Sequence, residues 1–103
     1  MRWQPSWEED VKFMLTFAIK PEIKGRDEAI ARFKKTGGQT PKGTELLDRW
    51  TAADFSGGFV LIESDDAAAL TENSLQRSDL MELRIVPVVE DAQLADVLVR
   101  AGM

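Results

Sequence analysis

The chain contains no cysteine, no histidine and no tyrosine among its 103 residues. Without cysteine there is no disulfide and no thiol nucleophile, and without histidine there is no Ser-His-Asp triad and no imidazole ligand for a metal ion. An acid or base would have to be a carboxylate, a lysine or a group perturbed by arginine, and a metal site would need oxygen ligands alone. We therefore expect no metal site and no other cofactor.

The composition describes an ordinary folded protein. A length of 103 residues predicts one domain with a modest core of its own, and 44% hydrophobic with 30% charged residues argues against long disordered stretches. The net charge of -5 repels the phosphate backbone of nucleic acid. No apolar run approaches the roughly 20 residues that span a bilayer. The sequence thus predicts a cytoplasmic protein that binds neither nucleic acid nor a membrane.

Residues 1–10 differ from the rest, because they show no hydrophobic periodicity and no apolar core of the signal-peptide type. They are expected to form an N-terminal extension to a single domain over residues 11–103. Trp3 and Trp7 would expose a large apolar area in a free tail, so we expect them to pack on the body of the protein or on a partner chain.

Hydrophobic periodicity divides the remainder into alternating strands and helices. Period-two patterns predict strands over residues 11–19, 45–53, 59–64 and 80–89. Helical patterns predict helices over residues 26–35, 67–76 and 92–101. Asp65 or Asp66 is the expected N-cap of the second helix, with Leu70 and Leu75 as its apolar anchors, and Asp91 is the expected N-cap of the third.

The order β-α-β-β-α-β with a closing helix predicts an α+β, ferredoxin-like fold, in which a four-stranded antiparallel sheet carries two helices on one face. Strict alternation puts one set of hairpin residues on one face and a second set on the other: Leu46, Trp50, Phe59 and Leu61, then Leu47, Val60 and Ile62. The face without helices would expose several hundred Å² of apolar surface, the scale of an interface. A second copy packing there would give a homodimer with twofold symmetry.

Two runs, LLDRWTAADFSGGFVLIESDD and SDLMELRIVPVVED, resemble a bacterial domain-of-unknown-function family of short proteins in the dimeric α/β-barrel superfamily. The resemblance covers about residues 11–101 and implies a dimeric α/β barrel. That superfamily includes cofactor-free monooxygenases, haem-degrading enzymes and muconolactone isomerase. Relatives often carry a histidine at the position of Thr51 and a tryptophan at that of Arg77. This chain has no histidine to serve as an axial haem ligand.

Polar and aromatic residues on the predicted strands are the candidate ligand contacts: Arg49, Trp50, Thr51, Glu63, Glu82 and Arg84. Arg49 and Glu63 lie on adjacent strands, so they either pair with each other or face an anionic ligand and its proton donor. Arg49 and Trp50 are consecutive and must point to opposite faces. Glu82 and Arg84 share one face, either as interface ion pairs or as polar lining of the barrel.

Two functions remain open from the sequence. One is a site in the barrel that binds or turns over a small apolar or anionic metabolite, with Arg49 or Arg84 holding an anionic oxygen and Glu63 or Glu82 as base. The other is a non-catalytic module for dimerisation or protein interaction. The sequence identifies no catalytic residue and does not decide whether the protein is an enzyme.

Overall fold

A computed structural model describes residues 11–21, 23–38, 40 and 42–103, so the predicted extension with Trp3 and Trp7 lies outside the described residues. The described part confirms the predicted order of elements. In chain order these are β1 (Val11–Ile19), α1 (Ile23–Thr36), β2 (Thr44–Thr51), β3 (Gly57–Ser64), α2 (Ala67–Arg77), β4 (Met81–Val88) and α3 (Asp91–Arg100). None of these helices is long and apolar enough to cross a membrane, and the longest, α1, has 14 residues.

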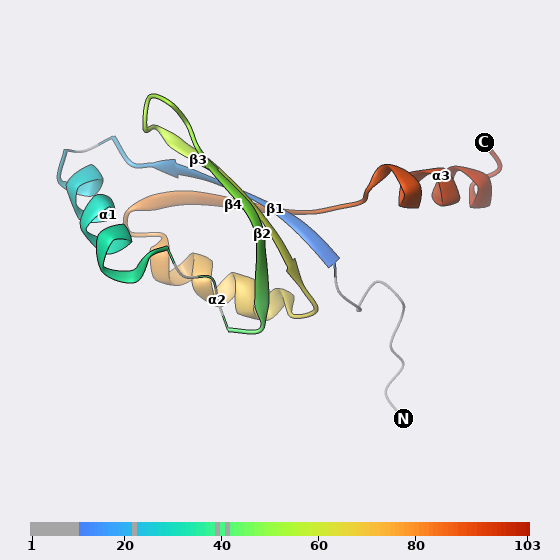
Figure 1. Ribbon diagram of the computed structural model, residues 1–103, viewed down its shortest axis with the longest axis horizontal. Coiled ribbons are helices and arrows are strands. Elements are labelled where there is room, and N and C mark those ends of the chain that lie inside the picture. The colour runs from blue at the N-terminus through green and yellow to red at the C-terminus, as the bar shows by residue number, and fades with distance from the viewer. Residues whose placement is uncertain (1–10, 22, 39, 41) are drawn as a thin grey trace.

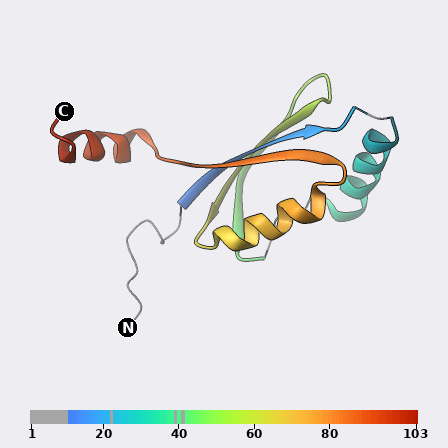
Figure 2. The same ribbon diagram turned by 180° about the vertical axis from the view of Figure 1, so that it is seen from behind.

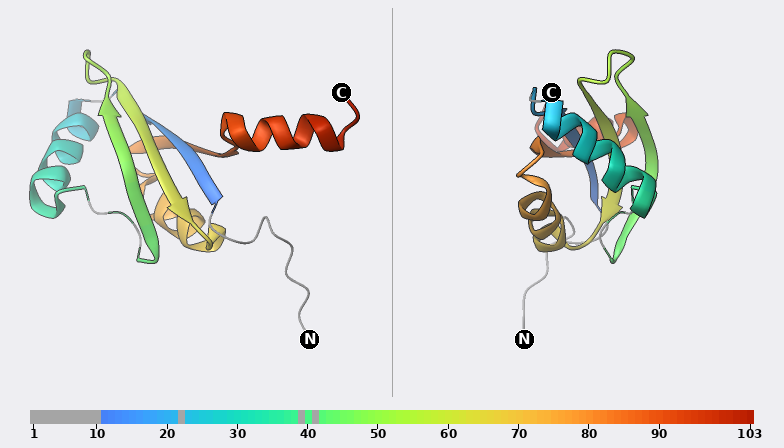
Figure 3. Two further views of the ribbon diagram at one scale, coloured as in Figure 1. Left: turned by 45° about the vertical axis from the view of Figure 1, so that its right-hand side comes forward. Right: turned by 90° about the vertical axis from the view of Figure 1, so that its left-hand side faces the viewer.

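The strands form one four-stranded sheet of order β2-β3-β1-β4 in which all neighbours are antiparallel, as in a ferredoxin-like fold. α1 and α2 lie on the same side of this sheet, and the sheet remains open, with β2 and β4 at its edges (Figures 1 and 3). We call the side with α1 and α2 the helix face. The opposite side is the open face. It carries Met14 and Thr16 of β1, their partners Leu61 and Phe59 of β3, and the residues of the edge strands that lie in register with these four.

The core lies between the helix face and α2. Leu15 from β1, Val60 and Ile62 from β3 and Leu70 from α2 are all buried together. This confirms the predicted alternation along β1 and the anchoring role of Leu70. The matching prediction for Leu75 is wrong, because its side chain is 71% exposed. The two leucines are five positions apart in the sequence. In a helix of 3.6 residues per turn, the second side chain therefore points about 140° away from the first.

A β-bulge in β2 changes which face its first residues occupy. Leu46 lies opposite Ile62 and Asp48 opposite Leu61, so that Leu47 is an extra residue in the ladder. Strict alternation places Leu46 on the same side as Trp50, and that prediction is wrong, since Leu46 shares the helix face with Ile62. Compared with strict alternation, a one-residue bulge reverses the face of the sheet on which each earlier residue of the strand lies. After the bulge, Arg49 and Trp50 lie as the alternation predicts.

The helix ends follow the local chemistry of the sequence, with one difference. Asp66 caps α2 by accepting a hydrogen bond from the Ala69 amide at 3.1 Å. Gly37, with φ of 69°, follows α1 in the left-handed conformation of a helix C-terminus. α3 begins one residue earlier than predicted, because Glu90 and not Asp91 is its N-cap. The Glu90 amide donates to the Gln93 side chain at 2.9 Å, as in a capping box.

Candidate functional site: a cationic cavity under the helix face

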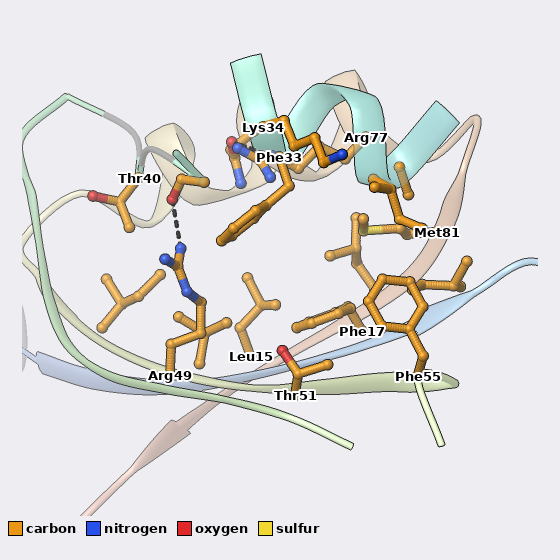
Figure 4. A pocket seen from close by; sticks show the side chains of 18 residues that line it. Leu15, Phe17, Phe33, Lys34, Thr40, Arg49, Thr51, Phe55, Arg77 and Met81 are labelled. Atoms are coloured by element: carbon orange, nitrogen blue, oxygen red, sulfur yellow. Dashed lines mark hydrogen bonds between the residues drawn. The ribbon is translucent and has the colours of Figure 1, made fainter. Parts of the chain in front are cut away.

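A cavity of about 400 Å³ lies between the helix face of the sheet and the helices (Figure 4). Side chains of the sheet, among them Leu15, Arg49 and Thr51, form one wall, and Phe33, Lys34 and Arg77 of the helices face them. Most of the lining is apolar: Leu15, Phe17, Ile19, Ala29, Ile30, Phe33, Phe55, Val60, Ile62, Met81 and Leu83. The site is therefore an apolar space with a few polar groups at defined places, which is typical of small-molecule pockets.

The position of α1 leaves room for this cavity. α1 lies over one end of the sheet, and Ala29 is its buried residue, at 5% exposure (Figures 1 and 4). Its outer side is tied to the turn after α2, where the Arg32 guanidinium donates to both Asp79 carboxylate oxygens at 2.8 and 3.2 Å. The same contact holds the pKa of Asp79 below its usual range. With this ion pair on its outer side, α1 leaves the space above Phe17 and Val60 unfilled.

Arg49 reaches from β2 across the cavity to the end of α1. Its Nη1 donates to the Gly38 carbonyl at 2.6 Å and its Nη2 to the Gly37 carbonyl at 3.4 Å, and the guanidinium lies over the Phe33 ring, 5.2 Å from its centroid. Gly38 has a φ of 67°, and a Cβ there would collide with the Arg49 guanidinium and the Phe33 ring. Glycine at this position thus allows the close approach of Arg49.

Two further cations line the same space, Arg77 from the last turn of α2 and Lys34 from α1. The Arg77 Nε donates to the Asn73 side-chain oxygen, Oδ1, at 3.1 Å, one helical turn earlier. Burial, and then the positive charges of Arg49 and Arg32, lower the pKa of Arg77 from its ordinary value. Among the described lining residues none is a carboxylate. The polar part of the cavity is therefore strongly cationic.

The structure divides the predicted site residues between the two faces. Arg49 and Thr51 line the cavity. The other four candidates lie on the open face: Trp50, Glu63, Glu82 and Arg84. Trp50 is 48% exposed and pairs with Phe59 across the strands, and Glu82 and Arg84 border a shallow hollow. The candidate residues therefore do not form a single site.

Arg49 and Glu63 neither pair with each other nor face one ligand together, the two alternatives that the sequence left open. Arg49 lies opposite Val60 on the helix face, whereas Glu63 lies opposite Glu45 and Lys12 on the open face. Glu63 instead forms an ion pair with Lys12 at 3.7 Å, and Lys12 also meets Glu90 at 3.1 Å. The hydrogen bond to Glu90 is the main cause that raises the pKa of Lys12. Residues on adjacent strands pair only when they share a face, and these two do not.

Seven polar or aromatic cavity residues were not among the site residues predicted from the sequence: Phe17, Phe33, Lys34, Thr40, Phe55, Asn73 and Arg77. Asn73 and Arg77 are four residues apart on one helix, a spacing at which side chains meet, so this pair carried a readable signal. Phe33 lies within the predicted helix over residues 26–35, but its partner Arg49 comes from a distant strand. Only the packing of α1 over β2 brings these two together.

The described residues contain no group of three acidic side chains that could hold a metal ion. Comparison with known families finds one match, to a family described as a domain of unknown function, DUF3303, over residues 11–102. No curated protein matches the chain. The matched residues include every element of the sheet and the whole described lining of the cavity.

Proposed function

The chain belongs to the DUF3303 family of domains of unknown function, and we propose that it binds a small, largely apolar molecule with one anionic group in the cavity under the helix face. One observation carries this proposal. An apolar cavity of about 400 Å³ is lined by three cationic side chains, Lys34, Arg49 and Arg77, and by no described carboxylate. Its volume falls within the range of about 300 to 1,000 Å³ for small-molecule sites.

The arrangement of charges suggests how such a ligand lies. Its apolar part would rest on Leu15, Phe17 and Val60, and its anionic group would lie between Arg49 and Arg77. Burial and then the positive charge of Arg49 lower the pKa of Arg77, and an anion held between the two guanidinium groups would offset the repulsion between them. A carboxylate or enolate oxygen would compete with the glycine carbonyls for the Arg49 Nη atoms, because charge-assisted hydrogen bonds are stronger than those to a neutral acceptor.

Binding is better supported than turnover. Glu63 and Glu82, the two residues that the sequence offered as a base, are on the open face, on the other side of the sheet. A general base must lie within hydrogen-bond reach of the proton it takes. Neither carboxylate meets that condition for a ligand held under the helix face.

The test is a thermal-shift comparison of apolar acids with their neutral amides, such as 1-naphthoate with 1-naphthamide and octanoate with octanamide. We expect the acids to raise the Tm of the wild-type chain and the amides to raise it much less, because only the acids carry the anion. Arg49→Met and Arg77→Met should each remove most of the shift.

Arg84→Met is the matched control, since it removes the same charge from the open face and should leave the shift unchanged. Equal shifts from acids and amides would overturn the anionic part of the proposal. Equal losses from Arg84→Met and Arg49→Met would overturn the assignment of the cavity.

The open face supports a second candidate function, assembly of two chains into the dimeric α/β barrel. Trp50, Phe59 and Val86 expose 48%, 50% and 38% of their surface there. Across the middle of this face Leu61, Met14 and Val86 stand side by side on three neighbouring strands, forming a continuous apolar row. We propose that two copies meet through this face as a homodimer with twofold symmetry, which light scattering over a range of concentrations tests. A Phe59→Glu substitution should produce monomers.

A further inference from the structure

α3 stands apart from the rest of the fold. It projects beyond the end of the sheet (Figures 1 and 2, and the left view of Figure 3), and none of its residues is buried. The structure is correspondingly elongated, with extents of 51 × 34 × 18 Å and a radius of gyration of 16.2 Å. A compact domain of about 100 residues has a radius of gyration near 13 Å. Among the residues that the structure describes, α3 therefore adds nothing to the buried core.

A helix of this length needs packing to be stable. α3 has 10 residues, and isolated helices shorter than about 12 to 15 residues are marginal in water. One side of α3 carries a stripe at positions i, i+3, i+4 and i+7: Leu94, Val97, Leu98 and Ala101. Leu94, Val97 and Leu98 are 43%, 39% and 41% exposed. The opposite side carries Asp96 and Val99, and Val99 is 76% exposed. The stripe is an apolar surface that the single chain leaves uncovered.

The connection to β4 keeps this stripe away from the chain's own sheet. Only Val89 and Glu90 separate the end of β4 from the start of α3. The Glu90 carboxylate is held by Lys12 of β1 at 3.1 Å, and its amide is held by Gln93 at 2.9 Å. The ion pair with Lys12 joins the first turn of α3 to the end of the sheet, and the Gln93 contact closes the first turn of the helix itself. The stripe therefore cannot pack on the open face of its own chain, but it can pack on the open face of another chain.

We infer that α3 packs its stripe on the open face of a second copy of this chain, against the exposed pair Trp50 and Phe59, so that two chains exchange their C-terminal helices. This inference rests on the proposed dimerisation through the open face and specifies which segment completes it. A twofold axis makes the exchange reciprocal, because each chain both gives a helix and receives one.

The area needed for a stable dimer favours α3 of the second chain as part of the interface. Four strands of about eight residues cover a footprint of roughly 19 by 26 Å, or about 500 Å². A standard interface buries about 800 Å² on each partner, so the sheet alone falls short. The helix, about 15 Å long and 10 Å wide, adds about 150 Å² of its own footprint and brings each chain to about 650 Å², closer to the standard area. Trp50 and Phe59 are cross-strand neighbours, and they offer an aromatic platform on which a short apolar stripe can pack.

The first experiment compares two sides of the same helix. Leu98→Asp places a negative charge on the stripe, and Val99→Asp places the same charge on the opposite side. By light scattering over a dilution series we expect the stripe variant to weaken the dimer by about tenfold or more and Val99→Asp to leave it unchanged, because only the stripe is buried on association. Hydrogen exchange should show α3 amides protected in the wild-type dimer and unprotected in the stripe variant.

The second experiment locates the helix, and it uses the absence of cysteine from the chain. A chain with Val97→Cys is mixed with a differently tagged chain with Phe59→Cys, and a short bis-maleimide is added. We expect mixed cross-linked dimers from this pair and few from Val99→Cys with Phe59→Cys.

The outcomes separate the two proposals. If Phe59→Glu gives monomers while the stripe variant remains dimeric, the helix exchange is wrong and the sheet interface stands. If Val97→Cys and Val99→Cys cross-link equally, the stripe is not on the partner's open face and the exchange is again wrong. A wild-type chain that stays monomeric at all concentrations would overturn both.

Discussion

The two faces of the sheet are made by the same strands and have opposite character. On β2, Arg49 points under the helices and is hydrogen-bonded to glycine carbonyls, while the next residue, Trp50, is 48% exposed on the other side. On β3, Ile62 is 2% exposed on the helix face and Phe59 is 50% exposed on the open face. Strand alternation thus allows one sheet to hold a ligand on one side and to meet a partner chain on the other.

The largest expected effect comes from neighbouring residues of β3 that point to the two faces. Ile62→Ala should lower the free energy of unfolding by about 3 kcal/mol, because it opens a hole in the core. Leu61→Ala, which removes a leucine from the open face, should cost only about 1 kcal/mol in the monomer. Urea unfolding at a concentration below dimer formation measures both. Equal losses would contradict the assignment of the core to the helix face alone.

An intermediate effect is expected at the glycines that follow α1. Gly37 and Gly38 have φ of 69° and 67°, but a Cβ on Gly37 meets nothing whereas a Cβ on Gly38 meets Arg49 and Phe33. Gly37→Ala should cost about 1 kcal/mol for backbone strain alone, and Gly38→Ala about 1 to 2 kcal/mol more because the cavity must rearrange.

Calorimetry measures these costs, and the acid-induced thermal shift should weaken in Gly38→Ala only. Identical behaviour of the two variants would show that Arg49 does not depend on its contact with Gly38.

The smallest effect concerns the ion pair that holds α1, and it depends on pH. Arg32 lowers the pKa of Asp79 in the folded chain, so the pair stabilises the fold above the carboxyl's unfolded pKa of about 4 and ceases to do so as the pH falls through the lower folded value. Asp79→Asn should be less stable than wild type at neutral pH, and the difference should vanish in acid. A cycle with Arg32→Gln isolates the pair; a difference independent of pH would contradict this account.

Much of the fold follows from local patterns in the sequence. Alternation identified β1 and the buried side of β3, and the Asp66 cap marked the start of α2, as the structure confirms. The errors have physical causes that local patterns do not contain. The bulge at Leu47 is a property of the ladder between two strands, and the exposed Leu75 sits on the wrong side of a helix that is anchored by one residue only.

The candidate site was harder to predict than the fold. Arg49 was identified because an arginine beside an aromatic residue on a strand is unusual enough to notice. Its true surroundings depend on the packing of α1 over β2, which brings Gly38 and Phe33 to it from far along the chain. Glu63 was assigned to the same site because proximity along a hairpin was given more weight than the side of the sheet. Arg77 contributes through α2, and no strand pattern points to it.

The bulge at Leu47 has one more consequence, which concerns deletions. Because it adds one residue to β2, the strand consists of two segments with opposite phase, joined at that point. Removing Leu47 would restore a regular ladder while leaving every other residue in place. Both segments would keep their present partners, and Arg49 and Trp50 would keep their sides of the sheet. A deletion of Leu47 should therefore leave both faces unchanged, whereas deletion of a residue that is paired in the ladder would turn one part of the strand over.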